Sequence, residues 1–266
     1  MDDQRKVRIS ATVRTRNEEA NLEECLKSIA WADEIVVVDS HSTDATIEIA
    51  GKYTDRIFIR EWPGHIAQSQ FATDHTSYDW VLSMDADERV SPELREEILA
   101  LDLDSTPNVA FEMPRYHYFM KRWINHSAWY PDYKVRLFRK DRCFWGGYSP
   151  HDSVQVNGST GRLKGNLIHY IYRDMEHFSA TKNSYSTLTS RDHHKSGRKA
   201  RVINFTLRPF YAFMYRYFAR LGFLDGIAGF IISIEEAHCV FLKYVKLYEL
   251  ERKLQLNSAK PDPRNQ

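Results

Sequence analysis

The most constraining feature of this sequence is the regular alternation of strand-like and helix-like segments along its first hundred residues. Short apolar runs rich in β-branched residues predict strands, and apolar residues repeated at helical spacing between them predict helices. The predicted strands cover residues 7–13, 34–39, 56–60 and 80–84, and the helices begin near residues 22, 42, 65 and 91. This alternation predicts βαβ units and an α/β fold with a mostly parallel sheet. Residues 108–172 mix short aromatic runs with turns and are expected to complete the sheet and line a pocket.

Capping residues mark the predicted helix starts. Asn21, with Glu24 three residues later, has the spacing of a capping box. Ser42 is expected to cap the next helix, through about residue 52, and Ser91 precedes a proline at the first helical position of another. The sequence therefore predicts three helices whose first turns adjoin strand ends.

Polar residues gather where three of the predicted strands end. They occupy residues 14–19, 39–44 and 85–89. Ligands of parallel α/β sheets bind at the carboxyl ends of the strands, where these clusters would meet. The convergence of three clusters predicts a binding site at this edge of the sheet.

Two carboxylates separated by one small residue follow the fourth predicted strand. Asp85 and Asp87 point the same way if the chain there is extended, and Ala86 between them takes little room. Such oxygen donors suit Mg²⁺ or Mn²⁺ bridging a diphosphate. Asp39, at the end of the second strand, is placed to accept hydrogen bonds from a base or a ribose hydroxyl. The alternative is turn and cap chemistry at both strand ends.

Charge and cysteine content narrow the class of protein. The net charge is +1, so a strong positive excess is lacking and nucleic acid is not expected as a partner. The three cysteines are far apart without metal-ligand spacing, which favours a reducing compartment. No apolar signal segment and no uninterrupted run long enough to span a bilayer is recognisable. A cytoplasmic location is the expectation.

The C-terminal part is basic and amphipathic. Residues 191–253 carry twice as many Lys and Arg as Asp and Glu, whereas residues 1–190 are net acidic. Residues 191–201 are expected to form a basic linker, and residues 257–266 a disordered tail. Between them, two apolar helical stripes with aromatic and basic borders predict peripheral binding to an anionic membrane surface. Packing onto the rest of the chain or onto a dimer partner is the alternative. The stripes comprise Phe210, Phe213, Met214, Tyr217, Phe218 and Leu221, and Ile227, Phe230, Ile231, Ile234, Phe241 and Val245.

Several segments together resemble one enzyme family. Those segments are residues 15–19, 30–40, 42–44 and 84–94, and the similarity continues through residues 129–138, 150–152 and 169–170 to the C-terminal helices. They resemble family 2 glycosyltransferases, and within that family the lipopolysaccharide core glucosyltransferases of the WaaE/KdtX type. The resemblance implies a GT-A fold, with a Rossmann-like nucleotide-binding sheet, and inverting transfer from a nucleotide sugar.

The resemblance also implies roles for individual residues. Glu18 and Asp39 match positions that contact the nucleoside. Asp85 would face the ribose or the metal, and Asp87 would ligate the metal. Gln68 lies in a segment that matches the family beside the nucleotide, where it would hydrogen-bond the base or the diphosphate.

Inversion needs a general base that deprotonates the acceptor hydroxyl. Asp152 is the candidate, because the glycines at residues 146–147 would let its loop approach the sugar closely. A surface turn carboxylate is the alternative. His151 and His169 are candidates for orienting residues or a metal ligand, with a structural role as the alternative for each.

Three arginines bear on how the site would bind its ligand. Arg136 and Arg139 flank an apolar pair and would either reach a phosphate or lie on a solvated strand edge. Arg16 stands where the family usually has tyrosine, which changes the nucleoside pocket in detail.

The predicted organisation is a GT-A domain over residues 1–190, followed by the linker and amphipathic helices of residues 191–256. The expected activity is metal-dependent transfer of a hexose, glucose by the resemblance, from a UDP-linked donor to a lipopolysaccharide-core or other lipid-linked glycan on the inner face of the plasma membrane. A metal-dependent nucleotidyltransferase is one alternative, although residues 14–21 contain no glycine for a phosphate loop. A non-catalytic, membrane-docked sugar-binding scaffold is another.

Overall fold

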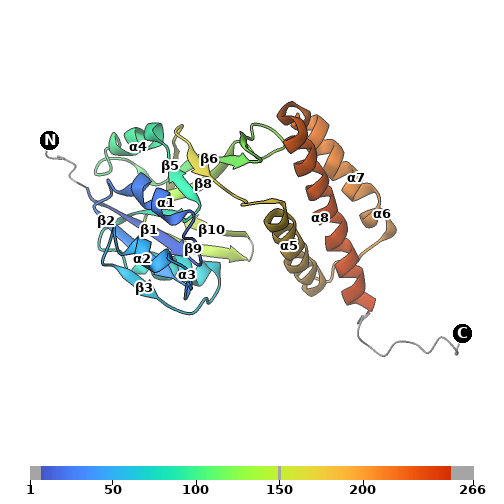
Figure 1. Cartoon of the computed structure of the whole chain (residues 1–266), viewed down its shortest axis with the longest axis horizontal. Helices are drawn as coiled ribbons and strands as arrows, with labels where there is room; N and C mark the ends of the chain where they lie inside the picture. The colour runs from blue at the N-terminus through green and yellow to red at the C-terminus, as the bar shows by residue number, and fades with distance from the viewer. Residues whose placement is uncertain (1–6, 149–150, 253–266) are drawn as a thin grey trace, which may run out of the picture. The chain divides into compact units, whose positions relative to one another are not determined.

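The structure is a computed structural model that describes residues 7–148 and 151–252 (Figure 1); for Tyr148, His151 and Asp152 the description is limited to the backbone. The chain divides into two compact units. Unit 1 comprises Met1–Asn125 and Trp129–Ile171, and unit 2 comprises His126–Ala128 and Tyr172–Gln266. The glycosyltransferase domain was expected to extend to residue 190, but the division falls at Ile171, because the helix that follows packs with the C-terminal helices.

Unit 1 is built on a sheet whose first half is parallel, as the βαβ pattern predicts. Strands β1 (Ile9–Thr15), β2 (Glu34–Asp39), β3 (Ile57–Ile59) and β4 (Trp80–Asp85) lie in the order β3-β2-β1-β4, and each neighbouring pair is parallel. The carboxyl ends of β1, β2 and β4 therefore meet at one edge of the sheet. This confirms the convergence of polar clusters expected from the sequence.

The second half of the sheet is mixed. Strand β8 (Asp132–Arg139) runs antiparallel to β4 and to the long β6 (Asn108–Phe119). Beyond β6 lie β12 (Leu167–His169), parallel to it, and β5 (Glu88–Val90), antiparallel to β12. The short β7 (Arg122–Trp123) and β11 (Ser159–Arg162) also pair with β6, and β9 (Cys143–Tyr148) forms a separate antiparallel pair with β10 (His151–Val156).

Helices cover both faces of the parallel strands. On one face, alternate residues of β1, β2 and β4 pack in one apolar cluster with α1 (Leu22–Ile29), α2 (Thr46–Ala50) and α4 (Pro92–Leu99). On the other face, Val36 and Val38 of β2 pack against α3 (His65–Asp74), and Val81 of β4 packs with the β9–β10 pair. Burial of both faces explains why β2 and β4 are nearly continuous apolar runs, whereas β1 alternates apolar residues with small hydroxyl residues.

Two of the three predicted helix caps are wrong. Ser91 caps α4 by accepting a hydrogen bond from the backbone of Leu94, as predicted. Asn21 makes no side-chain cap to α1 and instead donates from Nδ2 to Glu18 Oε2 at 2.9 Å. Ser42 lies before the α2 N-cap, Ala45, and its backbone and hydroxyl bond Asp39. Tertiary partners outcompete the local cap at both sites.

Unit 2 is helical. It contains α5 (Met175–Lys195), α6 (Val202–Phe205), α7 (Leu207–Met214), a π-helical turn at Tyr215–Ala219, a 3-10 turn at Gly222–Asp225 and α8 (Gly226–Arg252). Helix α8 packs against α5 and α7. Close approach of α8 to the preceding turn requires glycine, because a Cβ on Gly229 would lie 1.8 Å from the carbonyl oxygen of Gly222. The expected linker at residues 191–201 is wrong in its first part, since α5 continues to Lys195. The predicted tail at residues 257–266 lies outside the described residues.

Many apolar side chains of unit 2 remain exposed. No residue of α7 is buried, and Phe210 and Tyr211 are 62% and 68% exposed. Within the described residues no single helix has the length and hydropathy of a bilayer span, whereas Val202–Ala219 and Gly222–Arg252 pass that test only together, with a bend of 71° between them. The exposed apolar set of this region includes Val202, Ile203, Leu207, Phe210, Tyr211, Phe218, Leu221, Phe223, Leu224, Ile227, Phe230, Ile234 and Phe241.

Candidate active site

The loops that follow β1 and β2 are joined by hydrogen bonds. Asn17 adopts a left-handed conformation with φ of 53°. Its backbone nitrogen donates to Ser42 Oγ at 2.8 Å, and its side-chain oxygen accepts from the backbone of Thr43 at 2.8 Å. The backbone nitrogen of Glu18 donates to Thr46 Oγ1 at 2.8 Å. These bonds fix two of the three polar clusters against each other.

Asp39 and Gln68 lie at the β2 side of this edge and are fully buried. Asp39 accepts hydrogen bonds from Thr15 Oγ1 at 2.9 Å and from the backbone of Ser42 at 2.8 Å. Gln68 Nε2 donates to Ser40 Oγ at 3.0 Å, and its Oε1 has no partner among the described residues. A buried amide oxygen without a donor is uncommon in proteins and fits a ligand N–H or hydroxyl there. The nucleoside contacts predicted for Glu18, Asp39 and Gln68 stay predictions.

Asp85 is held by two arginines. Arg14 forms an ion pair with its Oδ1, and Arg136 Nη2 lies 2.5 Å from its Oδ2. Burial alone would raise the pKa of Asp85, but the charges of Arg136 and Arg14 outweigh burial and hold that pKa well below its ordinary value. Both carboxylate oxygens are thus engaged by guanidinium groups. Of its two predicted roles, facing the ribose requires less rearrangement of these contacts than binding a metal.

A network of buried charges surrounds Asp85. Glu88, which is fully buried, accepts from Arg136 Nη2 at 2.6 Å and from the backbone of Asp85 at 3.0 Å. Arg115 Nη2 donates to Asp132 Oδ2 at 2.7 Å. The three arginines of the network balance its three carboxylates, which satisfies the electrostatic requirement for burying charges. The network comprises Arg14, Arg115 and Arg136 with Asp85, Glu88 and Asp132.

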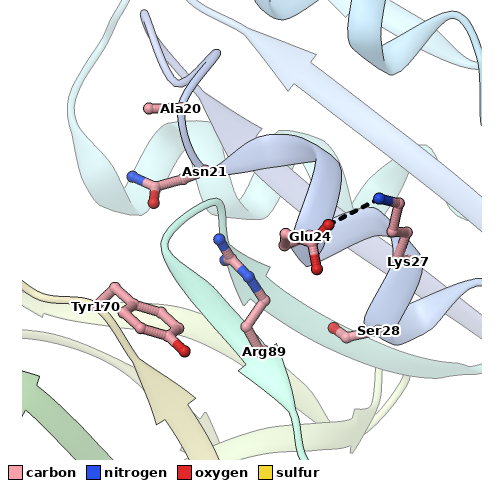
Figure 2. Close-up of a pocket in the computed structure, with 7 residues that line it drawn as sticks. All are labelled: Ala20, Asn21, Glu24, Lys27, Ser28, Arg89 and Tyr170. Atoms are coloured by element: carbon pink, nitrogen blue, oxygen red, sulfur yellow. Dashed lines mark hydrogen bonds and ion pairs between the residues drawn. The ribbon is translucent and has the colours of Figure 1, made fainter.

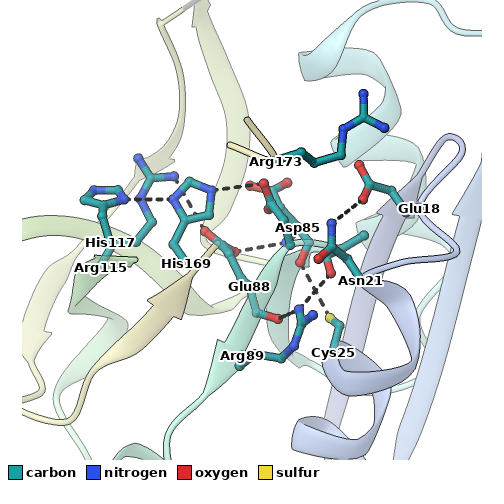
Figure 3. Close-up of polar contacts among 12 residues, drawn as sticks. Glu18, Asn21, Cys25, Asp85, Glu88, Arg89, Arg115, His117, His169 and Arg173 are labelled. Atoms are coloured by element: carbon teal, nitrogen blue, oxygen red, sulfur yellow. Dashed lines mark hydrogen bonds and ion pairs between the residues drawn. The ribbon is translucent and has the colours of Figure 1, made fainter. Parts of the chain in front are cut away.

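Asp87 lies outside this arginine network. Among the described residues it forms no ion pair with an arginine or lysine, and its partner is His169 Nε2, 3.1 Å from Asp87 Oδ2. His169 Nδ1 lies 3.0 Å from His117 Nδ1 (Figure 3). His117 Nε2 lies 3.7 Å from Asp132 Oδ2. The structure therefore brings together Asp87 and His169, two of the three residues predicted to hold a metal.

The pKa of His117 indicates where the protons lie in the series of contacts from Asp87 to Asp132. Burial lowers the pKa of His117 to about 4, so this ring is neutral near pH 7 and carries one proton. That proton is best placed on Nε2, toward Asp132, which leaves His117 Nδ1 as an acceptor. With His117 in that tautomer, His169 Nδ1 is the donor of the bond to His117 Nδ1. His169 Nε2 faces the Asp87 carboxylate.

The donor set at Asp87 and His169 fits a divalent cation. The described residues contain no preformed cluster of three or more His, Cys, Asp or Glu for a metal. Two protein ligands nevertheless match Mg²⁺ or Mn²⁺ in nucleotide sites, where phosphate oxygens and water complete the coordination. The His117–Asp132 pair would orient the imidazole of His169, as buried partners of metal-binding histidines commonly do. Asp87 and His169 are thus the residues that would hold the ion.

The predicted general base lies at the β9–β10 pair. The backbone of Asp152 is opposite Gly147 in that pair, and Gly147 has φ of 103°, a conformation that glycine adopts readily. The side chains of Asp152 and His151 lie outside the described residues. Their predicted roles stay predictions.

The other two arginines of the sequence prediction lie in different surroundings. Arg136 is buried within the network, whereas Arg139 is half-buried and pairs with Asp141 at 2.9 Å. Arg16 is exposed beyond the end of β1. The phosphate contact considered for Arg136 and Arg139 stays a prediction.

Sequence reasoning missed Arg115 and His117, and it gave no individual role to Glu88 or Asp132, which lie in the polar cluster at residues 85–89 and in the family-like segment at residues 129–138. One sequence signal could have found two of them. Arg115 and His117 are two residues apart in β6, so their side chains point to the same face of the strand. Their partners lie 17 to 52 residues away along the chain, so spacing alone does not pair them.

An α/β sheet of this order, with paired carboxylates after its fourth strand, is the GT-A-like fold. The mannosyltransferase PcManGT from Pyrobaculum calidifontis shares it with a TM-score of 0.53 at 14% identity, covering 92% of this chain and 88% of that one.

Sequence comparisons identify the family. Residues 10–157 match the family model described as Glycosyl transferase family 2. The chain is 30% identical over 254 residues to the lipopolysaccharide core biosynthesis glycosyltransferase LpsC of Rhizobium meliloti, covering 92% of this chain and 93% of that protein. It is 31% identical to an uncharacterized glycosyltransferase of Rickettsia bellii, covering 95% and 89%. The chain belongs to glycosyltransferase family 2 and is a glycosyltransferase.

Proposed function

We propose that this enzyme transfers a hexose, glucose in the first instance, from a UDP-linked donor to a lipopolysaccharide-core or other lipid-linked glycan, with a divalent metal at Asp87 and His169. The observation that carries the proposal is the Asp87–His169 pair, because Asp87 is the carboxylate of the motif that the arginine network leaves unneutralised. The similar LpsC carries the lipopolysaccharide-core assignment in its name. PcManGT was solved with GDP-Man and Mn²⁺, which supports a nucleotide-sugar donor and a metal.

The proposed reaction is a single displacement. The acceptor hydroxyl oxygen attacks the anomeric carbon, the bond from that carbon to the diphosphate oxygen breaks, and Asp152 takes the hydroxyl proton. The metal, when bound, offsets the charge that develops on the departing nucleoside diphosphate. Gln68 Oε1 would accept a hydrogen bond from the donor, and Asp39 would hold the β1 and β2 loops that surround the nucleoside.

A donor screen tests the proposal. The purified full-length protein is incubated with UDP-, GDP- and CMP-linked sugars and Mn²⁺, and release of the nucleotide is measured with and without core oligosaccharide. We expect UDP release from UDP-glucose, stimulated by the oligosaccharide and abolished by EDTA. Turnover with GDP-sugars alone would overturn the UDP assignment. Release of pyrophosphate from a nucleoside triphosphate would instead support a nucleotidyltransferase, and no turnover with any donor would support a sugar-binding scaffold.

We further propose that unit 2 binds the inner face of the plasma membrane peripherally. The exposed apolar set of unit 2 supplies side chains that would enter the lipid interface. Residues 191–253 carry a basic excess that complements anionic lipid. We expect co-sedimentation with anionic liposomes at low salt, partial release by high salt and full release by detergent. Failure to co-sediment at low salt would mean that these residues contact protein instead.

A further inference from the structure

Beside the Asp87–His169 pair, unit 1 contains a pocket of about 540 Å³ that the proposed chemistry does not use (Figure 2). This volume is within the range of about 300–1,000 Å³ that is usual for small-molecule sites. Helix α1 forms one wall, and β5 and the residue after β12 form the other. The polar and aromatic lining consists of Asn21, Glu24, Lys27, Ser28, Arg89 and Tyr170.

The pocket lies near the proposed metal site, although Asp87 and His169 do not line it. Arg89 follows Asp87 by two residues, and Tyr170 directly follows His169. The backbone nitrogen of Tyr170 donates to the carbonyl oxygen of Asp87 at 3.0 Å. A molecule in the pocket would therefore contact residues whose backbone adjoins the two residues that are proposed to hold the metal. The buried Asp39 and Gln68, assigned to the donor nucleoside, belong to β2 and α3, which do not line this pocket.

Arg89 has hydrogen-bonding capacity left over. Its Nη1 donates to the carbonyl oxygens of Ala86 at 3.0 Å and Glu88 at 2.9 Å. In the part of the chain that the structure describes, it forms no ion pair with a carboxylate. Its guanidinium carbon lies 5.3 Å from the centre of the Tyr170 ring. The remaining N–H groups are thus available to a ligand and are positioned by the same turn that carries Asp87.

The pocket chemistry matches a sugar better than a bare anion. Lys27 is already paired with Glu24 at 2.7 Å and with Glu23 at 3.2 Å, so the pocket has little net positive charge to attract phosphate. An amide, a carboxylate, a hydroxyl and a guanidinium within one pocket offer both donors and acceptors, which suits the many hydroxyl groups of a saccharide. Tyr170, 39% exposed, offers a ring against which the C–H face of a sugar can pack.

We infer that this pocket is the subsite for a saccharide unit of the glycan acceptor, with Tyr170 as the stacking platform and Arg89 as the principal hydrogen-bond donor. The inference rests on the proposed function, because it gives the occupant as the acceptor of that reaction. It assigns acceptor recognition to the α1–β5 side of the metal pair and donor recognition to the β2–α3 side.

Steady-state kinetics of variants test this assignment. Tyr170→Ala and Arg89→Ala should each raise the KM for lipid-free core oligosaccharide about tenfold or more relative to the KM for UDP-glucose, since a lost ring contact or charged hydrogen bond has roughly that effect. Tyr170→Phe keeps the ring and should restore most of the affinity. Arg162→Ala is the matched control, because Arg162 also lies over a tyrosine ring, 4.1 Å from the centre of Tyr133, but lines no part of the pocket.

Binding measurements separate the two levels of the inference. Saturation-transfer NMR of the oligosaccharide with the full-length protein should show contact in the wild type and loss of it in Tyr170→Ala, and a thermal melt verifies that the variant is folded. Equal changes in the donor and acceptor KM, or unchanged saturation transfer in the variant, would overturn the subsite. Absence of sugar transfer by the wild type would overturn the proposed function instead, while the NMR comparison would still decide whether the pocket binds saccharide.

Discussion

Asp85 and Asp87 are two residues apart, yet the structure gives them different surroundings. Asp85 lies between Arg14 and Arg136, whereas Asp87 faces His169. A carboxylate already neutralised by two guanidinium groups has less to offer a cation than one paired with an imidazole. The two aspartates should therefore differ in what they do when substituted.

Asp87→Asn should abolish Mn²⁺-dependent binding of UDP and leave the fold intact, because it removes a charged oxygen ligand from a half-exposed position. Asp85→Asn should instead lower the free energy of unfolding by on the order of 3 kcal/mol, since it leaves two mostly buried arginines without their counter-charge. Isothermal titration with UDP and Mn²⁺, and urea unfolding, check both. Equal effects of the two substitutions on metal-dependent binding would contradict this division of roles.

His117→Phe should weaken Mn²⁺ binding about 10- to 100-fold, the usual effect of removing the partner of a metal-binding histidine. Phenylalanine keeps a ring to pack against Trp129 but offers no acceptor to His169 Nδ1. Electron paramagnetic resonance of free Mn²⁺ in the presence of UDP measures the affinity. His194→Gln, at an exposed histidine of α5 in unit 2, is the control. An unchanged affinity would mean that His117 does not orient His169.

Burial of neutral His117 also predicts a pH dependence. Its pKa is lowered to about 4 in the folded protein, below the unfolded value of about 6.5. Between these values the unfolded chain binds more protons, so the stability contribution is complete above pH 6.5 and is lost progressively as the pH falls toward 4. Urea unfolding in EDTA should show this loss, and the loss should be smaller in His117→Phe. Parallel pH profiles for the two proteins would refute the assignment.

What the sequence predicted best is the position of a residue relative to its own strand. The placement of Asp87 after a strand and of His169 near the end of another could be foreseen, and the structure brings them together. The arginine network could not, because Arg14 and Arg136 reach Asp85 from 71 and 51 residues away. Which charged side chains of neighbouring strands meet depends on strand order and register, and neither is written in the periodicity of a single strand.

Among the elements, β1, β2, β4 and α1 were predicted closely because each has a buried apolar pattern of its own. The short strand β5 was not predicted, since Glu88–Val90 is only three residues long and owes its conformation to pairing with β12. The π-helical turn at Tyr215–Ala219 also escaped prediction, because the apolar spacing through it is compatible with an uninterrupted α-helix.

The exposed helix α7 carries an element-scale prediction. Phe210→Glu and Tyr211→Glu should each reduce partitioning onto anionic liposomes about tenfold or more, since burying a large aromatic side chain contributes roughly 1.5–3 kcal/mol. Neither side chain is needed by the core, being 62% and 68% exposed. Phe144→Glu, at a residue of unit 1 that is 57% exposed, is the matched control. Co-sedimentation at low salt measures the effect, and identical binding of all three variants would locate the contact elsewhere.

At the scale of the whole molecule, the helical unit is assembled from two separate parts of the chain. The short segment His126–Ala128, between β7 and β8, belongs to unit 2. The backbone of His126 donates to Asp225 Oδ2 at 2.9 Å, and the backbone of Ser127 donates to the carbonyl of Arg220 at 3.0 Å. Composition placed the boundary near residue 190, because neither α5 nor this segment differs in composition from the domain before it.

This arrangement predicts the behaviour of a fragment. Residues 172–266 expressed alone should unfold at a lower temperature than the helical unit of the full chain, because Asp225 is 1% exposed and loses its bonds from His126. Circular dichroism melts compare the two, with limited proteolysis to follow the helices in the full-length protein. A fragment as stable as the intact helical unit would show that the inserted segment adds nothing.

The inserted segment also limits how such enzymes can be recombined. A helical unit that takes three of its residues from the middle of the catalytic unit cannot be exchanged between relatives by one crossover at its start. A functional chimera would have to carry His126–Ala128 together with everything after Ile171 from the same parent. Substitutions in the loop between β7 and β8 would therefore have to stay compatible with the residues around Asp225.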